Sequence, residues 1–526
     1  MDEAAISDAA RRPASSQAGS RWKDLREWLA LVEEHGSLHR ITAEVDPNEE
    51  LSALTFMATR QKGSPALLFE RFANNPLGAR VLSNMLGASK ERYALAVGLD
   101  PGLSTLELVH ATRALMKKRI APVYVPGNDA PVNEVVLRGD EIDLTHLPAP
   151  TFWPADGGRF IGTGGITITS NPAGRLNVGC YRQQLHSPRR IGLNFVPGRH
   201  GQADCEASWA EGKPCEIVAA FGIDPALFMV GGMRFAPGES ELDAAGGIMG
   251  RPVELTKAEC VGIPIPAQAE IVIEGLAHPG DLEMEGPLGE FHGFYSGKPS
   301  RKPVIEVKAL HYRKSPIITA ALMATYPSCE IGEYQAIMRA ARILDDLDRI
   351  GIPGIKGAYC HPAAASGNCM VVVALKQMYP GHASQALALT AQCPTASYYT
   401  KWIIAVDDDV DPTNFDEVVW ALSTRCNPSE DLDILRNTMS FRADPSLAPD
   451  AKPYGSKVLI NACTPHRYIA QSPARTLLRR ATFARVAQRW SEFKMPGRPP
   501  SLTHFYEETF EATPEGGGQH AKARDR

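Results

Sequence analysis

The first pattern along the chain is helical. In WKDLREWLALVEEHG, apolar residues recur every three or four positions, and Gly36 stands where a helix would end. The apolar positions are Leu25, Trp28, Leu29 and Val32. A second helical pattern, in STLELVHATRALMKK, precedes Pro122. With the short mixed segments between them, these patterns predict an N-terminal α/β domain over residues 21–125.

Farther along, apolar and polar residues alternate. Runs such as GGITITS, AEIVIEGL and PVIEVKALHYR are separated by Gly and Pro, which is typical of short strands joined by turns. We therefore expect a β-rich central domain over residues 126–325 with a split-barrel-like or folded sheet. The insertion GRHGQADCEASWAEGK is predicted to hold a helix.

Helical and strand patterns alternate again after residue 326. Helices are expected in GEYQAIMRAARILDDL and FDEVVWALSTR, and strands in MVVVALKQ and KWIIAVDDDV. This predicts a C-terminal α/β domain over residues 326–495, and the fold class is α/β multi-domain (α+β). The basic stretch SPARTLLRRATFARVAQRW is predicted as an amphipathic helix, with a solvated face or a subunit contact. Composition predicts a disordered segment 1–20 and a flexible tail 496–526.

Composition narrows the class of protein. The 526 residues are 44% hydrophobic and carry a net charge of -5, whereas a nucleic-acid binder usually has a basic excess. The ten cysteines occur singly, which is typical of reduced thiols. The N-terminus has no apolar segment of signal-peptide or membrane-spanning length. We therefore expect a cytoplasmic protein with neither nucleic acid nor membrane as a partner.

Three polar residues of the central region are candidates for metal binding. Asn177 lies in NVGCYR, His200 in PGRHG and Glu241 in PGESELDAAGG. An amide oxygen, an imidazole and a carboxylate together suit a divalent ion such as Mn²⁺ or Mg²⁺. From the residues alone, a turn at Asn177 and separate structural roles for the three are favoured.

Two carboxylates stand close together in Glu285-Gly-Pro-Leu-Gly-Glu290-Phe-His-Gly. Pro287 and the glycines are incompatible with an ordinary helix, so a tight loop that can approach a ligand closely is predicted. Their surroundings can keep one carboxylate ionised beside a cation and the other protonated in an apolar pocket. A solvated acidic loop is the alternative, and the residues alone favour neither.

Lys401, at the start of a predicted strand, is a candidate point charge for a phosphate. A solvated lysine at a strand edge is the commoner interpretation. The triplet Asp407-Asp408-Asp409 stands where that strand should turn towards a helix. Turn and capping chemistry is therefore predicted for the triplet, rather than metal binding.

The order of these motifs resembles the UbiD-like decarboxylases over about residues 22–495. The opening domain of that family is similar to DLREWLALVEEHGSLHRI, GSPALLFE, NMLGASKERYALAVG and LPAPTFWPADGGRFIGTG. Its core site is similar to NVGCYRQQ, SELDAAGG and EGPLGEFHG, and its third domain to DDDVDPTNFDEVVWALSTR and GSKVLINA. Each motif is weak alone, but their joint order is hard to obtain by accident.

The resemblance implies prenylated FMN in the central domain, with its phosphate held by a divalent metal. Manganese is the commonest such metal, and magnesium and iron are alternatives. The implied metal ligands are Asn177, His200 and Glu241. The other implied cofactor-binding residues are Cys180, Tyr181, Arg182, Arg199 and Lys401. A monovalent cation such as K⁺ is expected near Val230–Met233.

The resemblance also implies that Arg182, Glu285 and Glu290 are catalytic. Direct loss of CO₂ from an sp² carbon leaves a carbanion without delocalisation, so a cofactor must act as the electron sink. The implied reaction is reversible, non-oxidative decarboxylation of an aromatic or α,β-unsaturated acid, or its CoA thioester, through a covalent adduct with the cofactor. Arg182 would bind the substrate carboxylate through its planar fork and keep Glu285 ionised. Glu290, with a raised pKa, would donate the proton.

One segment departs from the family pattern. Residues 323–330 read MATYPSCE, where many relatives have an Arg-Pro-Pro loop. The departure leaves the identity of the substrate open. Phe291, next to Glu290, is either an aromatic wall of the substrate pocket or a core residue.

Two other functions are considered: a non-catalytic assembly subunit of a larger carboxylase, and an ordinary FMN oxidoreductase. The intact set of site residues argues against the first, and the lack of a GxGxxG motif after a strand argues against nicotinamide binding in the second. The implied partners are a small carboxylic acid and CO₂, with a flavin prenyltransferase as the source of the cofactor. The implied assembly is a homo-oligomer, a dimer or hexamer, formed through the C-terminal domain.

Overall fold

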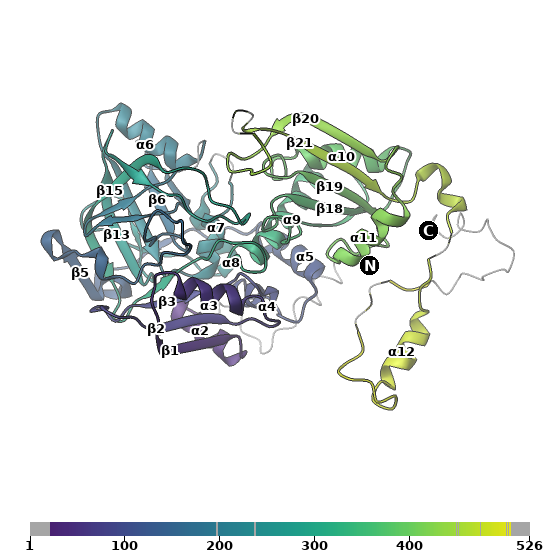
Figure 1. Cartoon of the computed structure of the whole chain (residues 1–526), viewed down its shortest axis with the longest axis horizontal. Coiled ribbons are helices and arrows are strands. Elements are labelled where there is room, and N and C mark those ends of the chain that lie inside the picture. Colours follow the sequence, from purple (N-terminus) through teal and green to yellow (C-terminus); the bar gives the residue numbers. More distant parts are fainter. Residues whose placement is uncertain are drawn as a thin grey trace. The chain divides into compact units, whose positions relative to one another are not determined.

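Figure 1 presents the computed structural model of the chain, which describes residues 22–195, 198–235, 238–448, 450, 452–473, 475–500, 502 and 504–506. The chain forms two compact units. The first holds the chain up to Ala341, with Pro362–Cys369 and Arg442–Ala448, and the second holds the remainder. The segment 1–20, predicted to be disordered, and residues 507–526 of the predicted tail lie outside the described residues.

The first unit begins with a four-stranded sheet in the order β1-β2-β3-β16. Its elements are α2 (Leu25–Glu34), β1 (Leu38–Glu44), α3 (Glu50–Ala58), β2 (Ala66–Arg71), β3 (Arg80–Ser83), α4 (Lys90–Ala96), α5 (Thr105–Leu115) and β16 (Ile317–Thr319). The carboxylate of Asp24 caps α2 by accepting the Glu27 N–H at 3.0 Å. The predicted apolar face of α2 is confirmed, because the residues it buries are Leu25, Trp28, Leu29 and Val32. Strand β16 adds in parallel to β3, although its sequence follows the central strands.

The central sheet of the first unit follows the order β7-β6-β10-β13-β15-β9-β8, and β14 and β5 also pair with β15. Its strands are β5 (Val135–Arg138), β6 (Ile166–Ser170), β7 (Leu176–Gly179), β8 (Leu185–Ser187), β9 (Arg190–Gly192), β10 (Cys215–Phe221), β13 (Ile271–Ala277), β14 (Leu282–Glu285) and β15 (Ser300–Tyr312). The end strands β7 and β8 do not pair with each other, so the described sheet is folded without closing into a barrel. The long strand β15 pairs with β13, β9, β14 and β5, and so holds these four strands together.

Three helices and a small sheet accompany these strands. They are α6 (His200–Ala210), α7 (Pro225–Gly231), α8 (Glu241–Met249), β4 (Val123–Tyr124), β11 (Glu254–Thr256) and β12 (Ile265–Pro266). Helix α6 confirms the helix predicted in the insertion. Both α6 and α8 pack against β7, which brings their first turns to the strand that carries Asn177.

The second unit is a five-stranded sheet in the order β17-β18-β19-β21-β20, entered through α9 (Gly332–Ile350). Its other elements are β17 (Ile355–Tyr359), β18 (Met370–Leu375), α10 (His382–Gln392), β19 (Trp402–Asp407), α11 (Phe415–Thr424), β20 (Leu432–Met439), β21 (Tyr454–Ala462) and α12 (Arg480–Gln488). Val372 and Ile404 pack with Val418 of α11, and α10 also contacts the central strands. Because successive side chains point to opposite faces, strands covered on both faces read as the continuous apolar runs seen in the sequence.

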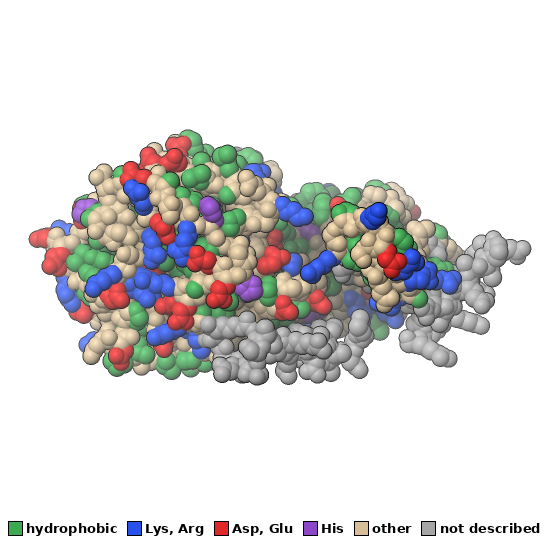
Figure 2. Space-filling model, turned by 90° about the horizontal axis from the view of Figure 1, so that it is seen from below, with side chains coloured by type: hydrophobic (Ala, Val, Ile, Leu, Met, Phe, Trp, Pro, Cys, Tyr) green, Lys and Arg blue, Asp and Glu red, His purple; other side chains and the backbone are tan. Residues whose placement is uncertain are grey.

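The basic C-terminal helix is shorter than predicted. It covers only Arg480–Gln488, because the chain just before it is extended: the carbonyl of Leu478 accepts the Tyr506 N–H at 2.9 Å, and Arg479 forms a bridge with Tyr506. On the face seen in Figure 2, basic and acidic side chains are interspersed over the larger part of the surface.

A buried pair, His311 and Glu274, joins β15 to β13. Nε2 of His311 lies 2.7 Å from Oε1 of Glu274, and both side chains are 0% exposed. We expect His311→Ala to lower the free energy of unfolding by about 1–3 kcal/mol, because the buried carboxylate loses its imidazole partner and keeps the N–H groups of Glu259 and Cys260. Urea unfolding followed by circular dichroism measures the loss.

His278 provides a matched control. It pairs with Glu306 at 3.0 Å beside the same two strands, but the two side chains are 42% and 41% exposed. Solvent screens such a pair, so His278→Ala should cost at most about 1 kcal/mol. Equal losses in the two variants would contradict the role given to burial.

Candidate active site

Arg182 lies in the loop between β7 and β8 and reaches Glu285, the last residue of β14. Its Nε and Nη2 atoms donate to the two carboxylate oxygens of Glu285 at 2.7 and 2.9 Å. The Glu285 side chain is 0% exposed, and Oε2 also accepts from Nδ2 of Asn194 at 3.0 Å. A bidentate ion pair of this kind fixes the guanidinium plane relative to the carboxylate plane. The fork of Arg182, which was expected to face the substrate, is therefore occupied by Glu285.

Glu290 contacts the same guanidinium at its other edge. Nη1 of Arg182 donates to Oε1 of Glu290 at 2.9 Å and to Oγ of Ser296 at 2.8 Å. The Glu290 side chain keeps 23% of its surface exposed, so it is the glutamate that a substrate can reach. The structure thus brings Arg182, Glu285 and Glu290 together.

The pKa values of Glu290 and Arg182 are both raised, but by different causes. Burial raises the pKa of Glu290; the charges of Glu285 and Asp156 add to that effect, and Arg182 opposes it without cancelling it. Burial alone would lower the pKa of Arg182, but the hydrogen bonds and charge of Glu285, aided by Glu290, outweigh it and hold that pKa above its usual range. Arg182 therefore stays cationic, while Glu290 is biased towards the protonated acid.

Two glycines allow the loop to bring its carboxylates to Arg182. Gly286 has a φ of +78°, which favours glycine, and a Cβ there would lie 3.1 Å from Nη2 of Arg182. A Cβ on Gly289 would lie 2.2 Å from Cδ1 of Trp153. A larger residue at either position would push the loop away from its neighbours.

Arg190 of β9 ties the β8–β9 hairpin to β14. Its Nη2 donates to Oδ1 of Asp281 at 2.7 Å, and its Nε contacts Glu283. Hydrogen bonds to these two carboxylates raise the pKa of Arg190. The tie fixes the hairpin that follows Arg182 relative to the strand that ends at Glu285.

The three candidate metal ligands lie on adjoining elements. Asn177 is on β7, His200 is the first residue of α6 and Glu241 is the first residue of α8. Nδ2 of Asn177 donates to Oγ1 of Thr169 at 3.1 Å, which turns the amide oxygen away from Thr169. Burial raises the pKa of Glu241, so a nearby cation would stabilise its carboxylate form. Oxygen, imidazole and carboxylate donors on adjoining elements fit a divalent ion.

Within the described ranges, no group of three or more His, Cys, Asp or Glu residues could hold a metal. The candidate set of Asn177, His200 and Glu241 is not such a group, because one of its three members is an amide.

Cys180 and Tyr181 follow β7 and link it to α7 and α6. Sγ of Cys180 lies 3.7 Å from the carbonyl oxygen of Phe228, and burial raises the pKa of the thiol to about 12. The Tyr181 hydroxyl accepts the Gly201 N–H at 3.2 Å. Arg199 is the residue before α6, directly preceding His200. These three candidates therefore adjoin the elements that carry the candidate metal ligands.

The predicted cation position, Val230–Met233, lies at the end of α7. The carbonyl of Gly231 in this stretch accepts the Cys180 N–H at 3.1 Å. The stretch thus contacts the same segment, and the cation itself stays a prediction.

Lys401 belongs to the second unit, one residue before β19. Its Nζ lies 6.0 Å from the ring centroid of Phe441. In the same unit, both oxygens of Asp409 accept from Arg425 at 2.7 Å, and Asp407 reaches Arg425 at 3.0 Å. Two residues of the acidic triplet thus form salt bridges at a turn, in line with the structural role predicted for them.

The segment 323–330 is anchored at both ends. The carbonyl of Met323 accepts from Nε1 of Trp153 at 3.1 Å. The carboxylate of Glu330 accepts the Met85 and Leu86 N–H groups at 3.0 and 2.6 Å, and burial raises its pKa to about 7. These contacts hold the segment in one arrangement.

Sequence reasoning missed four residues that hold the active-site loop. They are Asp156, Gln184, Asn194 and Ser296. The oxygen Oε1 of Gln184 accepts the Gly286 N–H at 2.8 Å. The sequence carried a signal for two of them, because Asp156 stands in the motif LPAPTFWPADGGRFIGTG and Gln184 in NVGCYRQQ.

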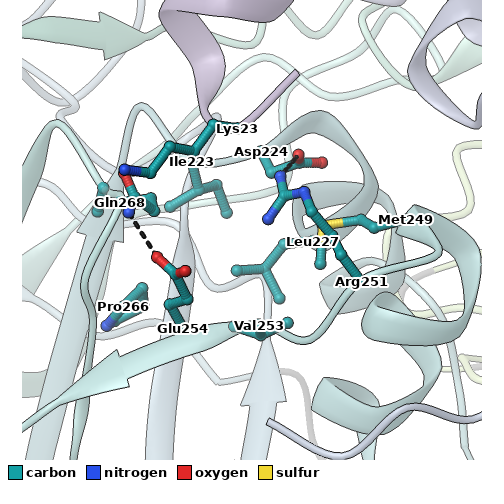
Figure 3. A pocket seen from close by; sticks show the side chains of 11 residues that line it. Lys23, Ile223, Asp224, Leu227, Met249, Arg251, Val253, Glu254, Pro266 and Gln268 are labelled. Atoms are coloured by element: carbon teal, nitrogen blue, oxygen red, sulfur yellow. Dashed lines mark hydrogen bonds and ion pairs between the residues drawn. The ribbon is translucent and has the colours of Figure 1, made fainter. Parts of the chain in front are cut away.

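Figure 3 shows a separate pocket near the start of α2, α7 and the β11–β12 strands. Asp224 pairs with Arg251 at 2.8 Å on one side, and Gln268 donates to Glu254 at 2.5 Å on the other. The cavity volume of about 30 Å³ leaves room for a few water molecules and not for an aromatic acid. None of the candidate site residues lines this pocket.

Among the described helices, none combines the length and apolar character needed to cross a membrane.

Comparison with known proteins matches the chain to three domains of one family. They are the N-terminal, Rift-related and C-terminal domains of UbiD, the 3-octaprenyl-4-hydroxybenzoate carboxy-lyase, at residues 29–112, 123–327 and 334–462. The order of the domains confirms the predicted fold class and the resemblance drawn from the motifs.

Solved structures match over most of the chain. The UbiD-class enzyme HmfF from Pelotomaculum thermopropionicum, in complex with FMN, is 31% identical with a TM-score of 0.75, over 84% of this chain and 95% of that one. The vanillic acid decarboxylase of Sedimentibacter hydroxybenzoicus is 28% identical with a TM-score of 0.80, over 90% and 98%. The 3,4-dihydroxybenzoic acid decarboxylase (AroY) of Klebsiella pneumoniae is 27% identical with a TM-score of 0.76, over 86% and 97%. The chain therefore belongs to the UbiD family of carboxy-lyases.

Proposed function

We propose that the protein catalyses reversible, non-oxidative decarboxylation of an aromatic or α,β-unsaturated carboxylic acid with the aid of prenylated FMN. The observation that carries the proposal is the Arg182 guanidinium, held between the buried Glu285 and the reachable Glu290. Similar enzymes have been solved with FMN and with prenylated FMN, which supports the flavin.

The chain offers residues that fit the cofactor. Asn177, His200 and Glu241 would hold a divalent metal, manganese in the first place, and through it the phosphate of the flavin. The backbone and side chains around Cys180 and Tyr181, with Arg199, would contact the flavin. The phosphate contact expected of Lys401 stays a prediction. When bound, a prenylated flavin supplies the electron sink that loss of CO₂ from an sp² carbon requires.

Arg182 is assigned to the substrate carboxylate. Since Glu285 occupies Nε and Nη2, the carboxylate is expected at the Nη1 edge, where it would replace Glu290 or Ser296 as an acceptor. Glu285 keeps the guanidinium in one plane, so Arg182 needs no reorganisation when the substrate arrives.

Glu290 is assigned as the proton donor. Burial raises its pKa, which keeps the carboxyl group protonated closer to neutral pH than an ordinary glutamic acid. It would deliver the proton to the carbon that has lost CO₂, and in the reverse direction it would accept that proton.

Phenolic acids are the first substrates to test, because two of the similar structures are decarboxylases of vanillic acid and 3,4-dihydroxybenzoic acid. CoA thioesters are the alternative, and the anchored segment 323–330 is proposed to decide between them. A flavin prenyltransferase would supply the cofactor. The protein is proposed to act as a homo-oligomer, a dimer or hexamer; a similar enzyme has been solved in an evolved dimeric form.

Co-expression with a flavin prenyltransferase tests the proposed function. The purified protein should contain a divalent metal, show the absorption of a modified flavin, and release CO₂ from at least one aromatic or unsaturated acid. Asn177→Ala should lose metal and flavin together, because both depend on one ligand set. Asn75→Ala is the control, since the Asn75 side chain makes two hydrogen bonds to the backbone of Ala79 and closes a surface turn. Loaded protein that decarboxylates no acid or thioester, or flavin that NADH bleaches rapidly, would argue against the proposal.

A further inference from the structure

The turn 152–157 holds the acidic loop, residues 285–296, at several points. The Gly157 N–H donates to the carbonyl of Pro287 at 2.8 Å, and the Ala155 N–H donates to the Tyr295 hydroxyl at 3.0 Å. Trp153 lies against Gly289, because a Cβ added to Gly289 would lie only 2.2 Å from Cδ1 of Trp153. The loop that carries Glu290 is therefore shaped by a turn far away in the sequence.

Asp156 is the polar centre of this turn. Its Oδ2 accepts the N–H groups of Phe152 and Trp153 at 3.1 and 2.9 Å, and its Oδ1 accepts the Gly289 N–H at 3.0 Å. Gly289 directly precedes Glu290, so this bond fixes the Leu288–Gly289 peptide group, one residue before Glu290. Because both oxygens accept N–H donors, the side chain fits its site as an anion.

We propose that Asp156 is a positioning residue for Glu290, whose carboxylate fixes the Gly289 peptide and places a further negative charge beside the proton donor. The inference rests on the proposed role of Glu290. It goes beyond that role, because it assigns part of the protonation of Glu290 to a residue outside the Arg182, Glu285 and Glu290 network.

The charges around Glu290 give the direction of the effect. Those that act on it are Arg182 from the β7–β8 loop, Glu285 from β14 and Asp156 from the turn. Arg182 stabilises the ionised form, and the two carboxylates oppose ionisation, in addition to burial. Removing the charge of Asp156 should therefore lower the pKa of Glu290.

Asp156→Asn in cofactor-loaded protein tests the proposal. A donor must be protonated, so turnover is lost as pH rises through the pKa of Glu290, and a lower pKa brings that loss at lower pH. We expect the basic limb of the pH profile to move down by roughly one pH unit. A difference infrared titration of the protonated carboxyl band, assigned with Glu290→Gln, should show the same shift without any turnover. Asp156→Ser, also neutral, replaces Asp156→Asn if that variant does not fold.

Asp143→Asn is the matched control, because Asp143 caps a nearby turn through the Thr145 N–H at 2.9 Å and does not act on Glu290. It should leave the limb and the infrared band in place. If Asp156→Asn lowers turnover at every pH but moves neither, Asp156 only builds the turn and the proposal is overturned. A shifted infrared band in protein that decarboxylates no acid would support the role of Asp156 and count against the proposed function instead.

Discussion

Glu290→Gln is expected to lower turnover by a factor of about 10²–10⁴ while the protein keeps its flavin, because glutamine has no acidic proton to give. Glutamine is close to glutamic acid in size and can still accept from Nη1 of Arg182, which Glu290 now does at 2.9 Å. The loss should therefore appear in the rate at saturating substrate. Steady-state CO₂ release, with flavin absorbance recorded on the same sample, measures both quantities.

The assignment of Glu290 as proton donor also predicts the pH dependence of turnover in the unchanged protein. Burial raises the pKa of Glu290, and a donor works only in its protonated form, so turnover should decline on the alkaline side as pH passes that pKa. A base in the same place would give the opposite slope. An alkaline limb that survives in Glu290→Gln would mean that another group sets it.

Glu306→Gln is the matched control for this substitution. Glu306 is on β15, pairs with His278 and Lys308 and is 41% exposed. The variant should keep turnover close to that of the unchanged protein. Full turnover in Glu290→Gln with cofactor bound would exclude Glu290 as the proton donor.

The fold could be predicted as far as it depends on local patterns. Helix α2 and strands such as β13 and β15 have a periodicity that needs no partner to be recognised. The pairing of β16 with β3 could not be predicted, because alternation marks a strand and does not name its neighbour. Helix α12 was predicted too long for a related reason: the extended residues before it are fixed by Tyr506, which the local pattern does not include.

The residues of the candidate site likewise fall into those that the sequence could identify and those that only the folded chain reveals. Asn177, Arg182, Glu285 and Glu290 stand in short motifs, so the family resemblance of those motifs could name them, whereas the residues alone left their roles open. Asp156, Ser296 and Asn194 act across 133, 114 and 91 residues of sequence, and only the folded chain brings them to their partners. The orientation of Arg182 was likewise beyond the sequence, because its fork is occupied by a carboxylate of its own chain.

Arg182→Met is expected to damage stability and turnover together. The Glu285 side chain is 0% exposed, and without Arg182 its remaining side-chain donor in the described part of the chain is the Asn194 amide at 3.0 Å. The free energy of unfolding should therefore fall by about 3–5 kcal/mol. Turnover should fall by at least about 10²–10³, the usual cost of removing one preorganised donor. Arg182→Lys should rescue little, since an ammonium cannot make the two-pronged bond.

The double variant Arg182→Met/Glu285→Leu separates the two losses. With both charges gone, no carboxylate is left buried without a partner, so most of the stability should return, as often happens when apolar residues replace a buried ion pair. Turnover should stay low, because no cation remains to bind the substrate carboxylate. Denaturant unfolding and CO₂ release on all four proteins of this cycle measure the two effects separately. If stability and turnover returned together, Arg182 would act on catalysis only by keeping the site folded, and its contact with the substrate would have to be given up.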